Sequence, residues 1–181
     1  LAQLGEGYSK AEREVVARYF DSPRTPEEHI PWLKAQAFKE YSAIQPLVQA
    51  LGKLYPQLDR QVDRHEYEEL CQKLGDEMSH ATLIMDFLEE LIGQRLTQKD
   101  LVWLPEDRKL AEVRGRYSRS YAGLLHGSER ITASEIQRRD EMLERAAITL
   151  TEGGGGALYD VCRHLRGNRV NRRIASIFGR I

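Results

Sequence analysis

Two long stretches of this sequence place apolar residues at alternating intervals of four and three, and this spacing restricts the fold more than any other feature. In residues 27–55 the positions are Leu33, Ala37, Glu40, Ile44, Leu47, Leu51 and Leu54, and in residues 63–92 they are Tyr67, Leu70, Leu74, Glu77, Ala81, Ile84, Leu88 and Leu91. This alternation keeps one face of an α-helix turned toward a partner helix. The spacing therefore predicts two long helices that pack against each other.

Local signals at the ends of the two stretches support the same two helices. Thr25 lies just before the first stretch, and Pro56 stops it. Asp63, with Glu66 three residues later, resembles a capping box at the start of the second stretch, and Gly93 ends it. Because the connection is short, we expect an antiparallel hairpin.

The remaining segments are also expected to be helical. Residues 1–26 include a short amphipathic stretch, and we interpret them as an N-terminal helical extension. A third long helix is expected to begin near Ser134 and to run to Leu165, with Gly167-Asn168 as its C-terminal stop. Because no segment alternates apolar and polar residues as a strand does, the sequence predicts an all-α fold.

One member of each stripe is a glutamate instead of an apolar residue. Glu40 interrupts the first stripe and Glu77 the second, and the midpoint between them falls at the centre of the connecting loop. In an antiparallel hairpin both glutamates are then at the same height, about 22 Å from the turn at 1.5 Å per residue. We therefore expect them to face each other.

Two carboxylates that meet in an apolar layer need a compensating charge, because repulsion and lost hydration would drive one to take up a proton. A divalent cation removes both costs, and His80 offers a nitrogen ligand on the same side of the helix as Glu77. This ligand set suits iron, manganese or zinc better than magnesium or calcium. Glu40, Glu77 and His80 are thus predicted metal ligands. The alternative is that the glutamates reach solvent or pair with Arg and Lys side chains.

These residues resemble the ligands of the ferritin-like di-metal carboxylate proteins. Their four-helix bundle takes one Glu from each of two helices and a Glu-x-x-His from each of the other two. Glu40 matches the first Glu, and Glu77 with His80 matches the first Glu-x-x-His. The mixed segment 94–134 would be the long crossover of that bundle, carrying an extra helix. The resemblance implies a ferritin-like bundle over residues 27–181.

The resemblance also implies a glutamate in the third helix and a second Glu-x-x-His in the fourth. Among Glu141, Glu144 and Glu152 we favour Glu152, which follows an apolar run inside the predicted helix. The four glycines 153–156 predict either room for a substrate beside a ligand or a loop that splits the helix. The second motif is absent up to Ile181, and matched heights place it a few residues further on, so the fourth helix is interpreted as truncated.

Asp160 and His164, four residues apart, are an internal alternative to the missing motif. Their directions differ from that of Glu152 by about 80° and 120°, which favours a local surface pair or groups that support the ligands from behind. His29 and His65 lie near predicted helix ends, and we expect both to be exposed.

The composition mainly constrains which partners the protein can bind. Lys and Arg number 27 against 28 Asp and Glu, so the net charge of -1 gives no general attraction to nucleic acid or anionic lipid. No apolar run approaches the roughly 18 residues of a membrane span. No targeting segment is visible, so the cytoplasm is the expected location. A homodimer is compatible with the sequence.

The resemblance implies a di-iron oxidoreductase or oxygenase that uses dioxygen or peroxide on a small-molecule substrate. Two irons would bind per chain if the fourth helix is complete, and manganese is the alternative metal. The glycine run beside Glu152 favours oxygenation of an organic substrate over iron storage. A different class stays open, namely a non-catalytic metal-binding or interaction bundle whose site is incomplete or vestigial.

Overall fold

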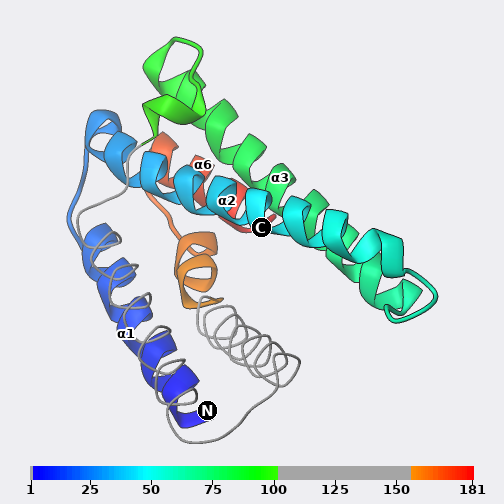
Figure 1. Cartoon of the computed structure of the whole chain (residues 1–181). Coiled ribbons are helices and arrows are strands. Elements are labelled where there is room, and N and C mark those ends of the chain that lie inside the picture. The colour runs from blue at the N-terminus through cyan, green and yellow to red at the C-terminus, as the bar shows by residue number, and fades with distance from the viewer. Residues whose placement is uncertain (1, 102–155) are drawn as a thin grey trace, which may run out of the picture. The chain divides into compact units, whose positions relative to one another are not determined.

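The computed structural model describes residues 2–101 and 156–181 of the chain (Figure 1). Its named elements are the helices α1 (Ala2–Asp21), α2 (Pro26–Leu54), α3 (Arg64–Ile92) and α6 (Arg169–Phe178) and the short 3-10 turns η1 (Tyr55–Gln57) and η2 (Gln98–Asp100). Residues 156–163 are helical as well.

The chain divides into two compact units. One unit holds residues 24–104, and the other holds residues 1–23 together with residues 105–181. The first contains α2 and α3, and the second contains α1 and α6. The predicted division into an extension, 1–26, and a bundle, 27–181, stays a prediction.

Helix α2 begins where the sequence signals place it. Thr25 is its N-cap, and Pro26 occupies the first helical turn. The Glu28 N–H donates to the Thr25 hydroxyl oxygen (3.4 Å), and the Thr25 N–H donates to the Glu28 carboxylate (2.7 Å). This reciprocal pair satisfies two backbone donors that a helix start leaves without intrahelical partners.

Helix α3 is likewise fixed at both ends by its own sequence. The Asp63 carboxylate accepts a hydrogen bond from the His65 N–H at 2.8 Å. Gly93 ends the helix in the left-handed conformation, with φ of 77°, and its N–H donates to the Glu89 carbonyl at 2.8 Å. A positive φ is readily adopted by glycine, so this residue type marks the end of α3.

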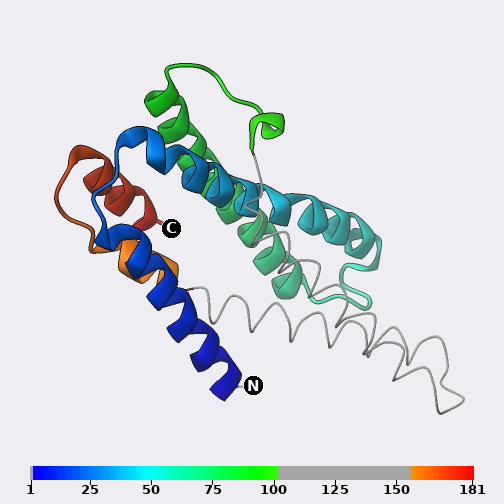
Figure 2. The same cartoon turned by 90° about the vertical axis from the view of Figure 1, so that its left-hand side faces the viewer.

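The predicted antiparallel hairpin is confirmed. Helices α2 and α3 pack side by side and run in opposite directions, as two views of the chain show (Figures 1 and 2). The turn between them contains η1, and Asp59 in it adopts a left-handed φ of 61°. Arg64, the first residue of α3, forms an ion pair with Asp59 at 2.9 Å. The turn therefore brings the start of α3 back beside the end of α2.

Burial along the two stripes is uneven. The half of the hairpin away from the turn is fully enclosed at Leu33, Ala37, Ala81, Ile84 and Leu88. Nearer the turn Leu51 is buried, but Ile44, Leu47, Leu70 and Leu74 are only half-buried. Glu40 and Glu77 lie between these two halves, at the inner end of the enclosed core.

The second unit is also held together by helix contacts. Val170, Ile174, Ile177 and Phe178 form the buried face of α6. The Phe178 ring lies 5.9 Å from the ring of Tyr159, measured between centroids. Asn168 caps α6 by accepting a hydrogen bond from the Asn171 N–H at 2.7 Å. The predicted stop at Gly167-Asn168 is therefore partly wrong: the preceding helix ends at residue 163, and Asn168 begins the next one.

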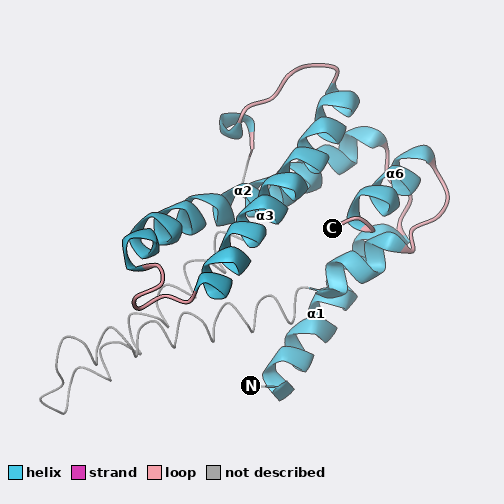
Figure 3. Cartoon of the chain, turned by 90° about the vertical axis from the view of Figure 1, so that its right-hand side faces the viewer, coloured by secondary structure: helices cyan, strands magenta, loops and turns pink. Residues whose placement is uncertain are grey.

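Across the described residues of both units, Figure 3 shows helices and loops and no strand. The predicted all-α fold class is thus confirmed.

Candidate metal centre

The structure brings the three predicted ligands of the hairpin together. Glu40 comes from α2, and Glu77 and His80 come from successive turns of α3. One donor atom from each residue lies within 4.8 Å of the others. The expectation that the two glutamates face each other is confirmed, whereas their role as metal ligands stays a prediction.

The three side chains are largely shielded from solvent, and two of them contact each other. The His80 Nδ1 atom lies 3.2 Å from a carboxylate oxygen of Glu40. The side chain of Glu40 is 9% exposed and that of His80 is 22% exposed. A carboxylate this buried needs compensation, and the neighbouring imidazole supplies part of it.

Burial above all, together with the negative charge of Glu40 and a hydrogen bond with Glu40, raises the pKa of Glu77 to about 7. The charges of His80 and Lys73 oppose this shift. At neutral pH the two glutamates therefore tend to hold one proton between them, as predicted for facing carboxylates. A divalent cation would replace that proton and relieve the repulsion.

This shift predicts how the stability of the metal-free protein depends on pH. The pKa of Glu77 is 4.5 in the unfolded chain and about 7 in the folded one, so between these values only the folded state binds the proton. The contribution of Glu77 to stability is therefore fully present below the lower pKa and is lost as the pH rises through the higher one. In Glu77→Gln this contribution is absent.

Thermal unfolding of wild type and Glu77→Gln, measured in chelator between about pH 5 and 8, checks this. We expect the melting temperature of the wild type to fall relative to that of the variant as the pH rises. A constant difference across the range would show that Glu77 titrates in the folded state as it does in the unfolded chain.

The donor set fits a transition metal in chemistry and in size. Two carboxylates and an imidazole are ligands that iron, manganese and zinc accept. Three donors bound to one such ion at about 2.1 Å lie about 3.0–3.6 Å from each other. The three donor atoms, now within 4.8 Å of each other, would need to approach by at most about 2 Å.

The remaining predicted ligands are not placed. Glu141, Glu144 and Glu152 lie outside the described residues, as does most of the predicted crossover 94–134. A second Glu-x-x-His is absent from residues 1–181. These parts of the ferritin-like interpretation stay predictions.

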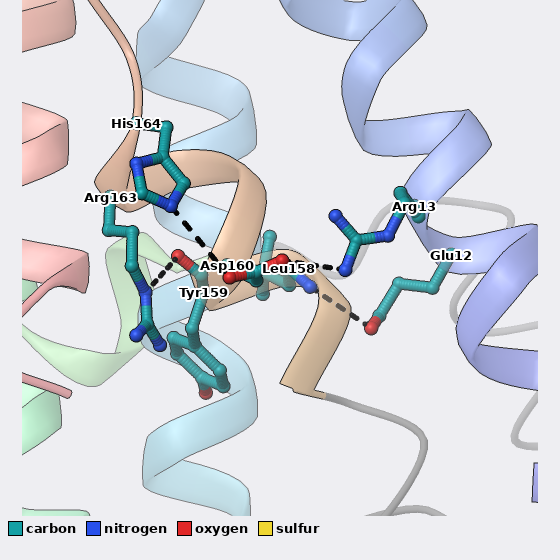
Figure 4. A network of polar contacts seen from close by, with 7 residues as sticks. All are labelled: Glu12, Arg13, Leu158, Tyr159, Asp160, Arg163 and His164. Atoms are coloured by element: carbon teal, nitrogen blue, oxygen red, sulfur yellow. Dashed lines mark hydrogen bonds and ion pairs between the residues drawn. The ribbon is translucent and has the colours of Figure 1, made fainter.

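The surface-pair interpretation of Asp160 and His164 is confirmed. The two side chains are exposed, with His164 Nε2 lying 3.9 Å from an Asp160 oxygen. Asp160 also accepts a hydrogen bond at 2.6 Å from Arg13 of α1, which lowers the pKa of its carboxyl group (Figure 4). Asp160 is therefore held by a cation of its own unit.

A second contact joins α1 to the helical residues 156–163. The Leu158 N–H donates to the Glu12 carboxylate at 3.1 Å, and Figure 4 shows Glu12 reaching from α1 toward that backbone. Of the glycines 153–156 only Gly156 lies among the described residues, so both interpretations of the glycine run stay predictions.

Two buried polar residues of α2 were missed. His29, predicted to be exposed, is 1% exposed, and its burial lowers its pKa, with the charge of Arg24 adding to the effect. The prediction was wrong because the first half of α2 is buried on more than one side, at Trp32 and Ala35 as well as on the stripe. Gln36 is 4% exposed. Its position four residues before Glu40 could have drawn attention to it.

Comparison of the chain with protein-family models, with curated proteins and with solved structures finds no match. The case for a metal site therefore depends on the geometry of Glu40, Glu77 and His80. Among the described helices, none combines the length and the apolar character needed to cross a membrane.

Proposed function

We propose that this protein binds iron at Glu40, Glu77 and His80 and acts as a ferritin-like di-iron oxidoreductase. It would use dioxygen or peroxide to oxidise a small-molecule substrate, with manganese as the alternative metal. The observation that carries the proposal is the meeting of two carboxylates and an imidazole in one partly buried group, with donor atoms within 4.8 Å. A second iron would need further ligands, for which we propose Glu152 and a Glu-x-x-His after Ile181.

The residues of the hairpin would each have a distinct task. Glu40, the most buried of the three, would supply a carboxylate ligand, and His80 beside it would supply a nitrogen ligand. Glu77 would release its proton when the metal binds, because its pKa is about 7 without one. Bound iron would supply the redox chemistry. The enclosed core beside the group, at Ala37 and Ala81, would keep bulk water from it on that side.

Oxygen consumption tests the proposal. The full chain is loaded with Fe²⁺ under anaerobic conditions and then mixed with air-saturated buffer. We expect Fe²⁺ oxidation and oxygen uptake at least about tenfold faster than with the double variant Glu40→Gln/Glu77→Gln, in which both anionic ligands are lost. Equal rates for the two proteins would contradict the proposed activity.

One observation favours a second candidate, a non-catalytic bundle with a vestigial site. The contact between Glu40 and His80, together with the proton on Glu77, satisfies much of the group without a metal. Metal binding without accelerated Fe²⁺ oxidation would support a non-catalytic metal-binding protein. A full chain that binds no metal at neutral pH would support the vestigial site.

A further inference from the structure

The segment that follows Asp160 is strongly basic. Residues 161–181, here called the basic segment, contain six arginines and no lysine, aspartate or glutamate. All six are exposed, namely Arg163, Arg166, Arg169, Arg172, Arg173 and Arg180. Residues 24–101, by contrast, carry nine basic side chains and fourteen acidic ones. The net charge of -1 therefore hides regions of opposite sign.

Helix α6 keeps its arginines apart from its apolar residues. At about 100° per residue, Arg169, Arg172 and Arg173 lie within an arc of about 100° around the helix axis. The four buried residues of α6 occupy an arc of similar width, centred about 140° away. The helix is thus anchored by one side and presents guanidinium groups on the other.

The known contacts of three of these arginines leave their charge in place. The three donate hydrogen bonds to backbone carbonyl groups, Arg163 to Tyr159 at 3.4 Å (Figure 4), Arg166 to Leu165 at 3.2 Å and Arg172 to Gly167. A carbonyl is neutral, so these bonds orient the guanidinium groups without neutralising them. Asp160, which also feels the charge of Arg163, already binds Arg13 at 2.6 Å. A surface of this kind attracts a partner that carries many negative charges.

The burial of apolar and aromatic residues narrows the class of that partner. A helix binds a membrane surface by inserting its apolar face, but that face of α6 is already buried within the protein. Single-stranded nucleic acid binds by stacking its bases on exposed aromatic rings. The aromatic residues of 156–181 are Phe178, which is fully buried, and Tyr159, which is half-buried against it. A duplex, which offers a dense row of phosphates and needs neither feature, fits best.

We propose that the basic segment binds the phosphate backbone of double-stranded nucleic acid. Guanidinium groups match phosphate oxygens in pairs, which suits a surface built from arginine without lysine. Contacts to phosphates carry no sequence information, so duplexes of unrelated sequence bind alike. This interaction is separate from the metal site proposed in the hairpin.

Fluorescence anisotropy of a labelled 20-base-pair DNA duplex tests the proposal. The full chain is titrated in chelator at salt concentrations between about 50 and 200 mM, so that bound metal plays no part. Each phosphate neutralised contributes about -0.9 to the slope of log K against log salt, where K is the association constant. For contacts by most of the arginines we expect a slope of about -4 to -5.

Substitutions within the basic segment should change that slope in proportion to the charges removed. In the triple variant Arg169→Gln/Arg172→Gln/Arg173→Gln we expect at least about a tenfold loss of affinity at the lowest salt and a slope shallower by about 3. The double variant Arg166→Gln/Arg180→Gln leaves α6 intact and should make the slope shallower by about 2. Circular dichroism checks that each variant is folded, and the double variant carries the test if the triple one is not.

The matched control removes three positive charges from the other unit. Lys53→Gln/Arg60→Gln/Lys99→Gln alters exposed residues of 24–101 and should change duplex affinity by less than about threefold, with the slope unchanged. An equal loss in this control would overturn the proposal, because net charge and not the basic segment would then govern binding.

Two competing anions test the class of partner. Vesicles containing phosphatidylserine should bind more weakly than the duplex, and polyglutamate should displace the labelled duplex less well than unlabelled duplex does. Vesicles that bind at least as tightly, or polyglutamate that displaces as well, would overturn the assignment to nucleic acid. A wild type that shows no binding to the duplex at about 50 mM salt would overturn the inference outright and leave the metal proposal untouched.

Discussion

Replacing His80 with alanine is expected to lower the affinity of the protein for Fe²⁺ by about 100-fold or more. His80 is the nitrogen donor of the group, and its ring lies 3.2 Å from Glu40. Without it, two carboxylates would have to hold the cation alone. Mutations that only disturb the surroundings of a metal ligand already cost about 10-fold to 100-fold, so loss of a ligand should cost at least as much.

Competition of the purified protein with a metal-binding dye under anaerobic conditions measures this affinity. His65→Ala is the matched control, because it removes an exposed histidine of the same helix. The control should bind Fe²⁺ as the wild type does. An equal loss in both variants would point to nonspecific binding by surface histidines.

Leu88→Ala is expected to destabilise the protein by about 2–5 kcal/mol. Leu88 is fully buried in the enclosed half of the hairpin, so truncation leaves a cavity that the surroundings cannot easily fill. Leu70 occupies an equivalent stripe position near the turn and is only half-buried. Leu70→Ala should therefore cost less than half as much.

Urea unfolding of both variants in chelator gives the two free energies. Equal losses would mean that the turn half of the hairpin is as well covered as the other half. That result would contradict the uneven burial of the stripes.

The hairpin and the group of three residues could be predicted because their causes are local. Helix α2 was expected at 27–55 and spans Pro26–Leu54, and α3 was expected at 63–92 and spans Arg64–Ile92. Caps and periodicity set these limits. Matched heights in an antiparallel pair were then sufficient to bring Glu40 and Glu77 together.

Burial beyond the hairpin could not be predicted in the same way. A stripe of apolar residues shows which face of a helix seeks a partner, but it does not show how completely that face is covered. His29 is a case in point, because a polar residue near a helix start is usually exposed, yet here it is enclosed with Trp32 and Ala35. Gln36 lies at the edge of the first stripe, where the spacing of apolar residues does not predict burial.

Anomalous X-ray diffraction from crystals of the full chain grown with Fe²⁺ or Mn²⁺ tests the existence of the metal centre most directly. Data collected at the absorption edge of the metal locate the ion without reference to activity. We predict an anomalous peak about 2 Å from donor atoms of Glu40, Glu77 and His80. Crystals grown with the metal in excess that show no peak between these three residues would contradict the account.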